Sequence, residues 1–216
     1  MASIRSAGRF HLALLVFIAA CQPAEDEGQA PTSAAPNRVA GEPPQPTLTC
    51  SDPVRPTDTA ASLQERYGDE TRVETLHGPE GVEFPGLVLW PDNPLRRLEV
   101  VFAEEGPRAV SSIGLSSGSE WRAAGLGIGH PLARANAANG KPFKLWGFSW
   151  DYGGYVSDLA GGKLAALPGG CRVVMRLGPH EGAEVPDALI GEVELSSDDP
   201  RLEAAGVTIE ELSLAF

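Results

Sequence analysis

Apolar and polar residues alternate in short runs along most of the chain, a pattern typical of strands. A weak helical face comes first, because Ala60, Leu63 and Tyr67 recur at helical spacing. Four strand-like runs follow, separated by turn residues. These runs are Val73–Leu76, Leu87–Trp90, Leu98–Phe102 and Ala109–Leu115. The first half of the chain therefore predicts one helix over residues 59–67 and then an antiparallel meander.

The second half repeats this order. Pro131 stands at the first position of a predicted helix that ends before Gly140, which matches the preference for proline at the start and glycine after the end. A short helix is predicted between Asp198 or Asp199 and Gly206. The predicted strands are Phe143–Tyr152, Tyr155–Leu159, Arg172–Leu177, Ala188–Leu195 and Val207–Phe216. Gly153-Gly154 is predicted to join the first two strands as a two-residue hairpin turn.

Both predicted helices end at a glycine, and Gly68 and Gly140 lie 72 residues apart. Thr57 or Asp58 is the expected cap of the first helix. The repeated order predicts an α+β fold of two helix-plus-meander lobes, about 48–118 and 119–216. Each lobe alone is too small to be stable, so we expect the two to share one sheet.

The first twenty residues have the features of a secretory signal peptide: Arg5 and Arg9, then the apolar run Leu12–Ala20. That run is too short to cross a bilayer as a helix. Residues 18–21, Ile-Ala-Ala-Cys, resemble the lipobox of bacterial lipoproteins. The resemblance implies cleavage before Cys21 and acylation of Cys21 with fatty acids such as palmitate. It also implies, through Gln22, the periplasmic face of the outer membrane.

Residues 21–47 follow as a tether rich in proline and acidic residues, with too few apolar residues to form a core. The globular domain is expected over residues 48–216. The formal charge is −12, and removal of Arg5 and Arg9 with the signal peptide makes it −14. Such an acidic chain is a poor partner for nucleic acid and favours a neutral or basic partner.

Cys50 and Cys171 are the two cysteines left after Cys21. In an oxidising compartment a disulfide between them is expected, and two buried free thiols are the alternative. The bridge would close a loop of roughly 120 residues, for which chain entropy gives about 4–5 kcal/mol of stabilisation.

One enzymatic motif is present: Gly114-Leu115-Ser116-Ser117-Gly118 fits the G-x-S-x-G nucleophile elbow. Asp151 or Asp158 and then His180 would complete the triad order. The antiparallel meander is not the alternating β/α pattern that this scaffold needs, which argues against a hydrolase. The three histidines beyond the signal peptide are widely spaced and each lies beside glycine or proline, so neither a metal site nor a cofactor is expected.

Aromatic residues recur at every second position between Trp146 and Tyr152, in a stripe that begins at Lys144. If the segment is a strand, these side chains share one face, and Tyr155 begins the partner strand. The candidate binding surface is therefore Trp146, Phe148, Trp150, Tyr152 and Tyr155. The alternative is that the stripe packs against the helices as core.

The run Leu63-Gln64-Glu65-Arg66-Tyr67-Gly68, before a meander, resembles the helix end of the β-lactamase-inhibitor-protein-like fold, which BamE/SmpA-type assembly lipoproteins share. The chain differs in having Pro-Thr-Asp-Thr at residues 56–59, where BamE-type chains carry Gly-Met-Thr. The resemblance implies a protein partner bound on a sheet face. We thus expect a non-enzymatic, membrane-anchored module that binds an envelope protein. The alternatives are an envelope serine hydrolase using Ser116 and a structural lipoprotein that contacts peptidoglycan.

Overall fold

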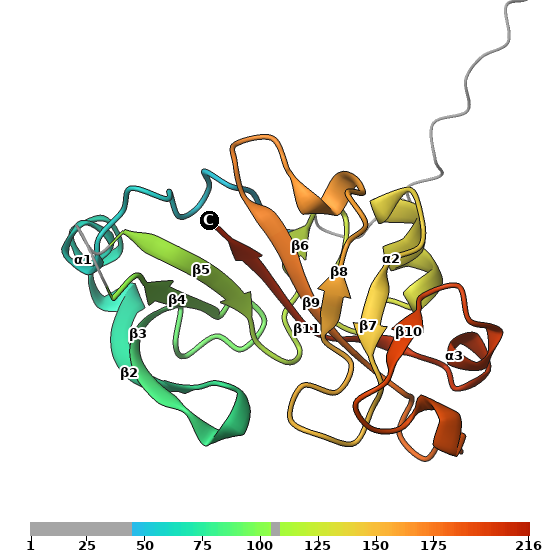
Figure 1. Ribbon diagram of the computed structural model, residues 1–216. Coiled ribbons are helices and arrows are strands. Elements are labelled where there is room, and N and C mark those ends of the chain that lie inside the picture. Colours follow the sequence, from blue (N-terminus) through green and yellow to red (C-terminus); the bar gives the residue numbers. More distant parts are fainter. Residues whose placement is uncertain (1–44, 105–108) are drawn as a thin grey trace, which may run out of the picture. The chain divides into compact units, whose positions relative to one another are not determined.

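A six-stranded antiparallel sheet forms the centre of the molecule (Figure 1), with strand order β2-β3-β4-β5-β11-β9. Its strands are β2 (Thr71–His77), β3 (Glu83–Leu89), β4 (Leu98–Phe102), β5 (Val110–Leu115), β9 (Arg172–Gly178) and β11 (Thr208–Ala215). The last strand of the chain, β11, lies between β5 and β9. The sheet therefore takes strands from both halves of the chain, and the fold is α+β as the sequence predicts.

The computed structural model describes residues 45–104 and 109–216, which belong to one compact unit, Pro43–Phe216. The predicted signal peptide, the lipidated Cys21 and the tether as far as residue 44 lie outside the described residues. Their roles stay predictions.

Two smaller sheets complete the strand content. One has the order β10-β7-β8, all antiparallel, and the other is the parallel pair β1-β6. Their strands are β1 (Thr47–Leu48), β6 (Arg122–Ala123), β7 (Lys144–Trp146), β8 (Val156–Asp158) and β10 (Glu194–Ser196). The second half of the chain thus differs from a single meander, because its strands divide between the central sheet and a sheet of their own.

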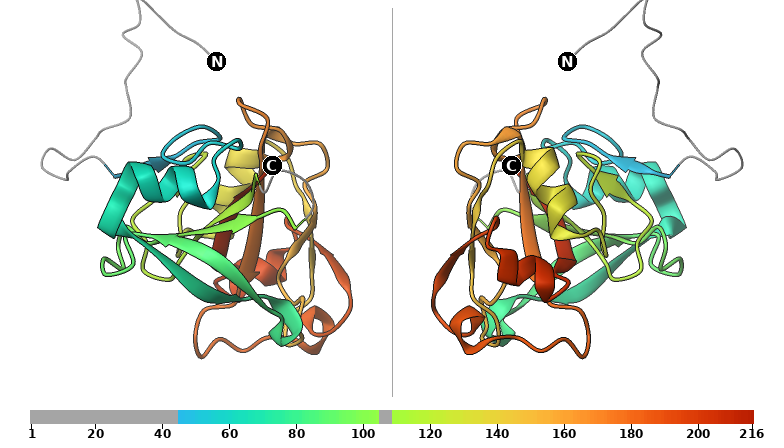
Figure 2. Two further views of the ribbon diagram at one scale, coloured as in Figure 1. Left: turned by 90° about the vertical axis from the view of Figure 1, so that its left-hand side faces the viewer. Right: turned by 90° about the vertical axis from the view of Figure 1, so that its right-hand side faces the viewer.

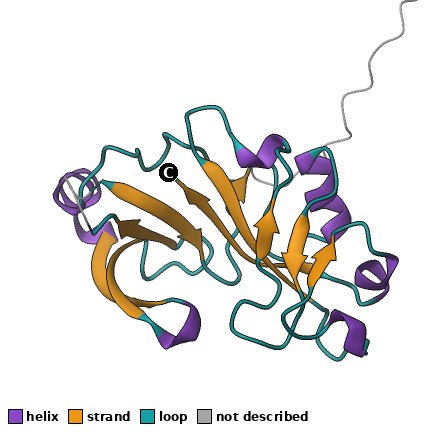
Figure 3. Cartoon of the chain, viewed as in Figure 1, coloured by secondary structure: helices purple, strands orange, loops and turns teal. Residues whose placement is uncertain are grey.

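In the described part of the chain, three short α-helices lie around the outside of the strands (Figure 3): α1 (Ala60–Tyr67), α2 (Leu132–Asn139) and α3 (Pro200–Ala204). Single turns of 3₁₀ helix are η1 (Gly68–Glu70), η2 (Pro79–Gly81), η3 (Lys163–Ala165) and η4 (Asp187–Leu189). Both views of Figure 2 place α1 and α2 at the same end of the molecule as the C-terminus.

The cap of α1 is Thr59 and not Thr57 or Asp58. The Thr59 hydroxyl accepts the Ser62 N–H at 3.2 Å, and the Ser62 hydroxyl accepts the Thr59 N–H at 2.9 Å. This reciprocal capping satisfies two donors that the first turn leaves free. Asp58 instead lies before the helix and accepts a hydrogen bond from the guanidinium of Arg66, in the last turn, at 2.6 Å.

The core forms where aligned strands place their leucines side by side. Leu89, Leu98, Leu115 and Leu212 stand opposite one another along a single row of the central sheet. All four are buried, and α1 contributes Leu63 to the same core. Because alternate residues point to the other face, this row explains why leucine and valine recur at every second position in these strands.

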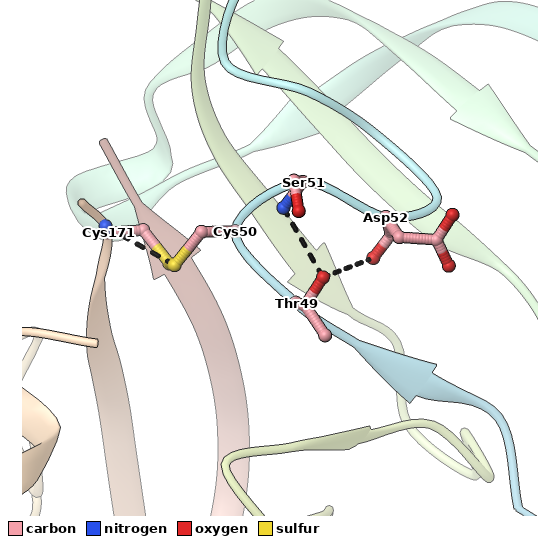
Figure 4. Close-up of a disulfide and its surroundings, with 5 residues drawn as sticks. All are labelled: Thr49, Cys50, Ser51, Asp52 and Cys171. Atoms are coloured by element: carbon pink, nitrogen blue, oxygen red, sulfur yellow. Dashed lines mark hydrogen bonds between the residues drawn. A yellow bond between two sulfur atoms is a disulfide. The ribbon is translucent and has the colours of Figure 1, made fainter. Parts of the chain in front are cut away.

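The Cys50–Cys171 disulfide ties the segment after β1 to the start of β9 (Figure 4), with Cα atoms 5.5 Å apart. Both cysteines are buried. The Cys171 N–H points at the sulfur of Cys50, at 3.3 Å. The disulfide therefore joins the start of the described domain to β9, across a sequence separation of 121 residues.

Candidate functional site

The aromatic residues of the predicted stripe beyond Trp146 lie on a loop, and the prediction of a strand over Phe143–Tyr152 is wrong there, because β7 ends at Trp146. Phe148 forms backbone hydrogen bonds across to the η4 segment, donating to the Leu189 carbonyl at 2.8 Å. Ser149 then adopts a left-handed conformation with φ 67°. This residue interrupts the alternation on which a common face depends.

Phe148 consequently leaves the candidate surface. Its side chain is 4 % exposed and belongs to the hydrophobic core. The alternative of a core role is thus correct for Phe148. It does not hold for the other aromatic residues, since Trp146, Trp150 and Tyr155 are half-buried and Tyr152 is 38 % exposed.

The predicted two-residue turn at Gly153-Gly154 is also wrong. The Trp146 N–H donates to the Tyr155 carbonyl and the Gly154 N–H to the Trp146 carbonyl, both at 3.0 Å, so residues 147–154 form the loop. Gly154 has φ 78°, and a Cβ atom there would collide with the carbonyl oxygen of Leu177. A glycine is therefore required where this loop lies against β9.

Four rings from this loop and its flanks contact one another in sequence. The ring centroids of Trp146 and Trp150 are 6.0 Å apart, those of Trp150 and Tyr152 5.6 Å, and those of Tyr152 and Tyr155 6.4 Å. The interplanar angles of 79°, 60° and 58° are edge-to-face or tilted, an arrangement that aromatic pairs favour. We call Trp146, Trp150, Tyr152 and Tyr155 the aromatic row.

Hydrogen bonds hold two members of the aromatic row, Trp150 within the loop and Tyr155 at one end. The Trp150 indole N–H donates to the Gly147 carbonyl at 2.8 Å within the loop. At the end of the row, the Tyr155 hydroxyl donates to Glu211 at 2.6 Å. Because these bonds hold the rings in one arrangement, less side-chain entropy is lost when a partner binds.

Arg176 of β9 extends the aromatic row by one planar group. Its guanidinium carbon lies 5.4 Å from the Tyr155 ring centroid, a cation–π distance. Its Nε donates to the Gly153 carbonyl and its Nη1 to Glu211, both at 2.9 Å. Arg176 thus joins the loop, Tyr155 and β11 in one network.

The electrostatics keep Tyr155 as a neutral donor. Burial raises the pKa of the Tyr155 hydroxyl, and the hydrogen bond to the Glu211 carboxylate raises it further, to about 12. The charge of Glu211 is balanced by Arg176 at 2.9 Å. The rings of the row themselves are uncharged, so this surface can desolvate at low cost.

Arg176 and Glu211 are members of the site that the sequence did not reveal. Each lies in a run correctly predicted as a strand. Arg176 and Glu211 are brought together by the pairing of β11 with β9. In that pairing Glu211 stands opposite Arg176, after an irregularity at residues 209–211. No local pattern in the sequence specifies that irregularity.

The residues of the predicted hydrolase motif are engaged elsewhere. Ser116 lies just after β5, and its hydroxyl donates to the Glu99 carboxylate at 3.3 Å. A ring nitrogen of His180 lies 2.7 Å from the Glu181 carbonyl oxygen. Asp158 accepts the Ala160 N–H in its own turn. The structure therefore records no hydrogen bond between these residues that would make a nucleophile–base pair.

Histidines and acidic residues form no cluster of three or more that could hold a metal ion within residues 45–104 and 109–216. His130 accepts the Gly127 N–H at 3.1 Å. Burial, with the nearby Arg134 and Arg122, lowers its pKa to about 4. In the part of the chain that the structure describes, no helix is long and apolar enough to span a membrane.

Comparison of the chain with family models, with curated proteins and with solved structures found no match. The resemblance to the β-lactamase-inhibitor-protein-like fold therefore stays a prediction, and the site has to be interpreted from its own chemistry.

Proposed function

We propose that this chain is a lipid-anchored protein of the bacterial envelope that binds a partner protein through the aromatic row, without catalysing a reaction. The single observation that carries the proposal is the contact of four partly exposed aromatic rings on a loop held by hydrogen bonds. The anchor is inferred from the sequence around Cys21.

The residue types of the row are those that dominate binding energy at protein interfaces. Tryptophan, tyrosine and arginine are enriched among interface residues whose truncation costs about 2 kcal/mol or more. Their planar side chains offer large apolar area with few rotatable bonds. A single exposed ring is common on protein surfaces and does not indicate a binding site. Four rings in a row that ends on Arg176 form a contiguous surface.

The charges of the domain favour a neutral or basic partner. Glu211 lies at one end of the row, and Glu194, hydrogen-bonded to Ser157 at 2.9 Å, lies opposite Trp146 in the small sheet. Together with the formal charge of −12, these groups disfavour an acidic ligand. Among the described residues the Tyr152 hydroxyl has no hydrogen-bond partner, so it can donate to a carbonyl of the partner.

The test is affinity capture from envelope extracts with the full-length lipidated protein. A Trp146→Ala, Trp150→Ala double variant should lose the captured protein, because both substitutions remove ring area from the row. The matched control is Leu95→Ala, Phe216→Ala, which removes two other exposed apolar side chains, 46 % and 37 % exposed. A partner retained by the row variant and lost by the control would contradict the assignment.

Two further readouts separate the alternatives. Sedimentation with purified sacculi that depends on Trp146 and Trp150 would replace a protein partner with peptidoglycan as the ligand of the same row. Esterase activity that a Ser116→Ala substitution abolishes would contradict the non-catalytic function. The proposal predicts neither result.

A further inference from the structure

The outer strands of the central sheet are β9 on one side and β2 on the other. At the β9 edge, Tyr155 forms a bridge to Arg176 and its segment lies alongside. At the other edge, β2 is the last strand and pairs only with β3. Figure 1 shows β2 as the outer strand at the left of the sheet. A seven-residue edge with free backbone groups is a template for pairing with another strand.

The register of β2 with β3 identifies the backbone groups that point outward. The Trp90 N–H donates to the Glu70 carbonyl, and the Gly78 N–H donates to the Val82 carbonyl. The backbone N–H and C=O groups of the even-numbered residues of β2 therefore point toward β3. Thr75 stands opposite Pro85, which has no N–H, in agreement with this phase. In antiparallel strands the N–H and C=O of one residue point the same way, so Val73 and Thr75 direct theirs away from the sheet.

The side chains of this edge are self-complementary in one register. Val73 is 62 % exposed, the largest exposed fraction among the large apolar side chains of residues 45–104 and 109–216. If a second β2 pairs antiparallel about Val73, then Val73 meets Val73 of the other copy, Arg72 meets Glu74 twice, and Thr71 meets Thr75 twice. Apolar, opposite-charge and threonine pairs are those that stabilise neighbouring strands.

We propose that β2 pairs with β2 of a second copy of this chain, antiparallel and about a two-fold axis at Val73, to extend the sheet across a dimer. The neighbouring registers that keep the same outward groups are unfavourable. A register centred on Glu74 places two Glu74 carboxylates opposite each other, and one centred on Arg72 places two guanidinium groups together. Charge complementarity thus selects both the occupant and the register.

Arg72 already lies 3.6 Å from Glu74 of its own strand, and its second partner is exposed. Arg72 binds Asp92 at 3.0 Å, and Asp92 is 83 % exposed, so this ion pair is readily exchanged for one with Glu74 of the other copy. Glu74 is held in place by Arg97 at 2.8 Å. A groove of about 920 Å³ opens beside Val73 and is lined mainly by apolar groups such as Phe84 and Phe102. The exposed apolar surface at this edge is therefore larger than the Val73 side chain alone.

The test is cysteine crosslinking of the full-length chain in membranes, with a short bismaleimide. A Val73→Cys variant should give a crosslinked dimer. Val82→Cys is the matched control, because Val82 is also a highly exposed valine, at 54 %, but lies beyond the end of β2. In the proposed register, position 82 of one copy lies roughly 30 Å from position 82 of the other, a distance that a short reagent cannot bridge. The unsubstituted chain gives the background crosslinking.

Two second-site changes in Val73→Cys complete the test. Arg72→Glu places two pairs of carboxylates across the axis and should reduce the dimer at least about tenfold. Thr75→Pro removes an outward N–H that the monomer does not use and should also reduce it. Three results would overturn the proposal. They are a dimer that Val82→Cys forms equally well, a Val73→Cys dimer that neither second-site change reduces, and a Val73→Cys adduct to a different protein. None of these outcomes depends on the aromatic row.

Discussion

Two pairs of tryptophans show how the same side chain serves as core in one region and as surface in another. Trp90 and Trp121 have ring centroids 5.6 Å apart, and Trp146 and Trp150 have centroids 6.0 Å apart. In each pair one indole N–H is satisfied by a backbone carbonyl: Trp121 donates to Arg96, and Trp150 to Gly147, both at 2.8 Å.

The pairs differ in what lies beyond the rings. Trp121 is 4 % exposed, and Trp90 packs between it, the ring of Tyr67 and the guanidinium of Arg96. Trp150 instead contacts Tyr152, which is 38 % exposed. Ring contact and a satisfied indole are therefore common to both regions. The extent to which neighbours cover the rings distinguishes a stabilising pair from a candidate binding pair.

The largest expected effect comes from breaking the buried pair. Trp121→Ala should lower the free energy of unfolding by about 3–5 kcal/mol, since a fully packed aromatic side chain is replaced by a cavity. Denaturant unfolding followed by far-UV circular dichroism measures this. A loss below about 1 kcal/mol would show that the covering neighbours do not make Trp121 a core residue.

The disulfide supports the same packed region. Replacing both Cys50 and Cys171 with alanine should lower the free energy of unfolding by about 2–5 kcal/mol, because the unfolded chain loses its crosslink. The same unfolding experiment measures the change. Unfolding of the native protein after chemical reduction of the disulfide gives a second comparison. The row should keep its partner at temperatures where the variant stays folded. Loss of binding by the folded variant would contradict the separation of the two regions.

Breaking the half-buried pair of Trp146 and Trp150 should cost less stability than removing Trp121. Trp150→Ala is expected to lower the free energy of unfolding by about 1 kcal/mol, the typical worth of its one hydrogen bond. Collisional quenching by acrylamide sharpens the comparison. A Trp146→Phe, Trp150→Phe variant retains only Trp90 and Trp121 and should be quenched less than a Trp90→Phe, Trp121→Phe variant. Equal quenching of the two variants would contradict the difference in coverage.

The smallest effect concerns the end of the row. Burial and, second, the hydrogen bond to the Glu211 carboxylate raise the Tyr155 pKa to about 12, so Glu211→Gln should lower this pKa part of the way toward its ordinary value of 10. A pKa raised on folding gives stability that is present below pH 10 and is lost as the pH rises toward 12. The variant should therefore lose less stability over that range. Spectrophotometric titration of the tyrosines measures it, and an unchanged titration would show that Glu211 has no influence on the row.

Local patterns predicted most of the central sheet. The run Leu98–Phe102 coincides with β4, and the helix predicted over residues 59–67 contains α1, although its cap is Thr59 and not the predicted Thr57 or Asp58. These elements are specified by nearby residues: alternation in the strand, and apolar spacing with a capping box in the helix. The α+β class follows from them.

The loop at residues 147–154 could not be predicted in this way. Its sequence alternates as a strand does, but Phe148 bonds to a segment some forty residues later, and Ser149 turns the chain by adopting a positive φ. Four of the five predicted surface residues are nevertheless brought together, and their role in binding stays a prediction. Arg176 and Glu211 were missed because only the long-range register of β9 with β11 joins them.

The central claim is tested most directly by photocrosslinking in living cells from two positions of similar exposure. A photoreactive amino acid replaces Tyr152, in the aromatic row, or Leu95, 46 % exposed and one residue from the Arg96 that covers Trp90. The account predicts an adduct of defined mass from position 152 that disappears with Trp146→Ala and Trp150→Ala, and none from position 95. The same adduct from both positions, or an adduct from position 152 that survives both substitutions, would contradict it.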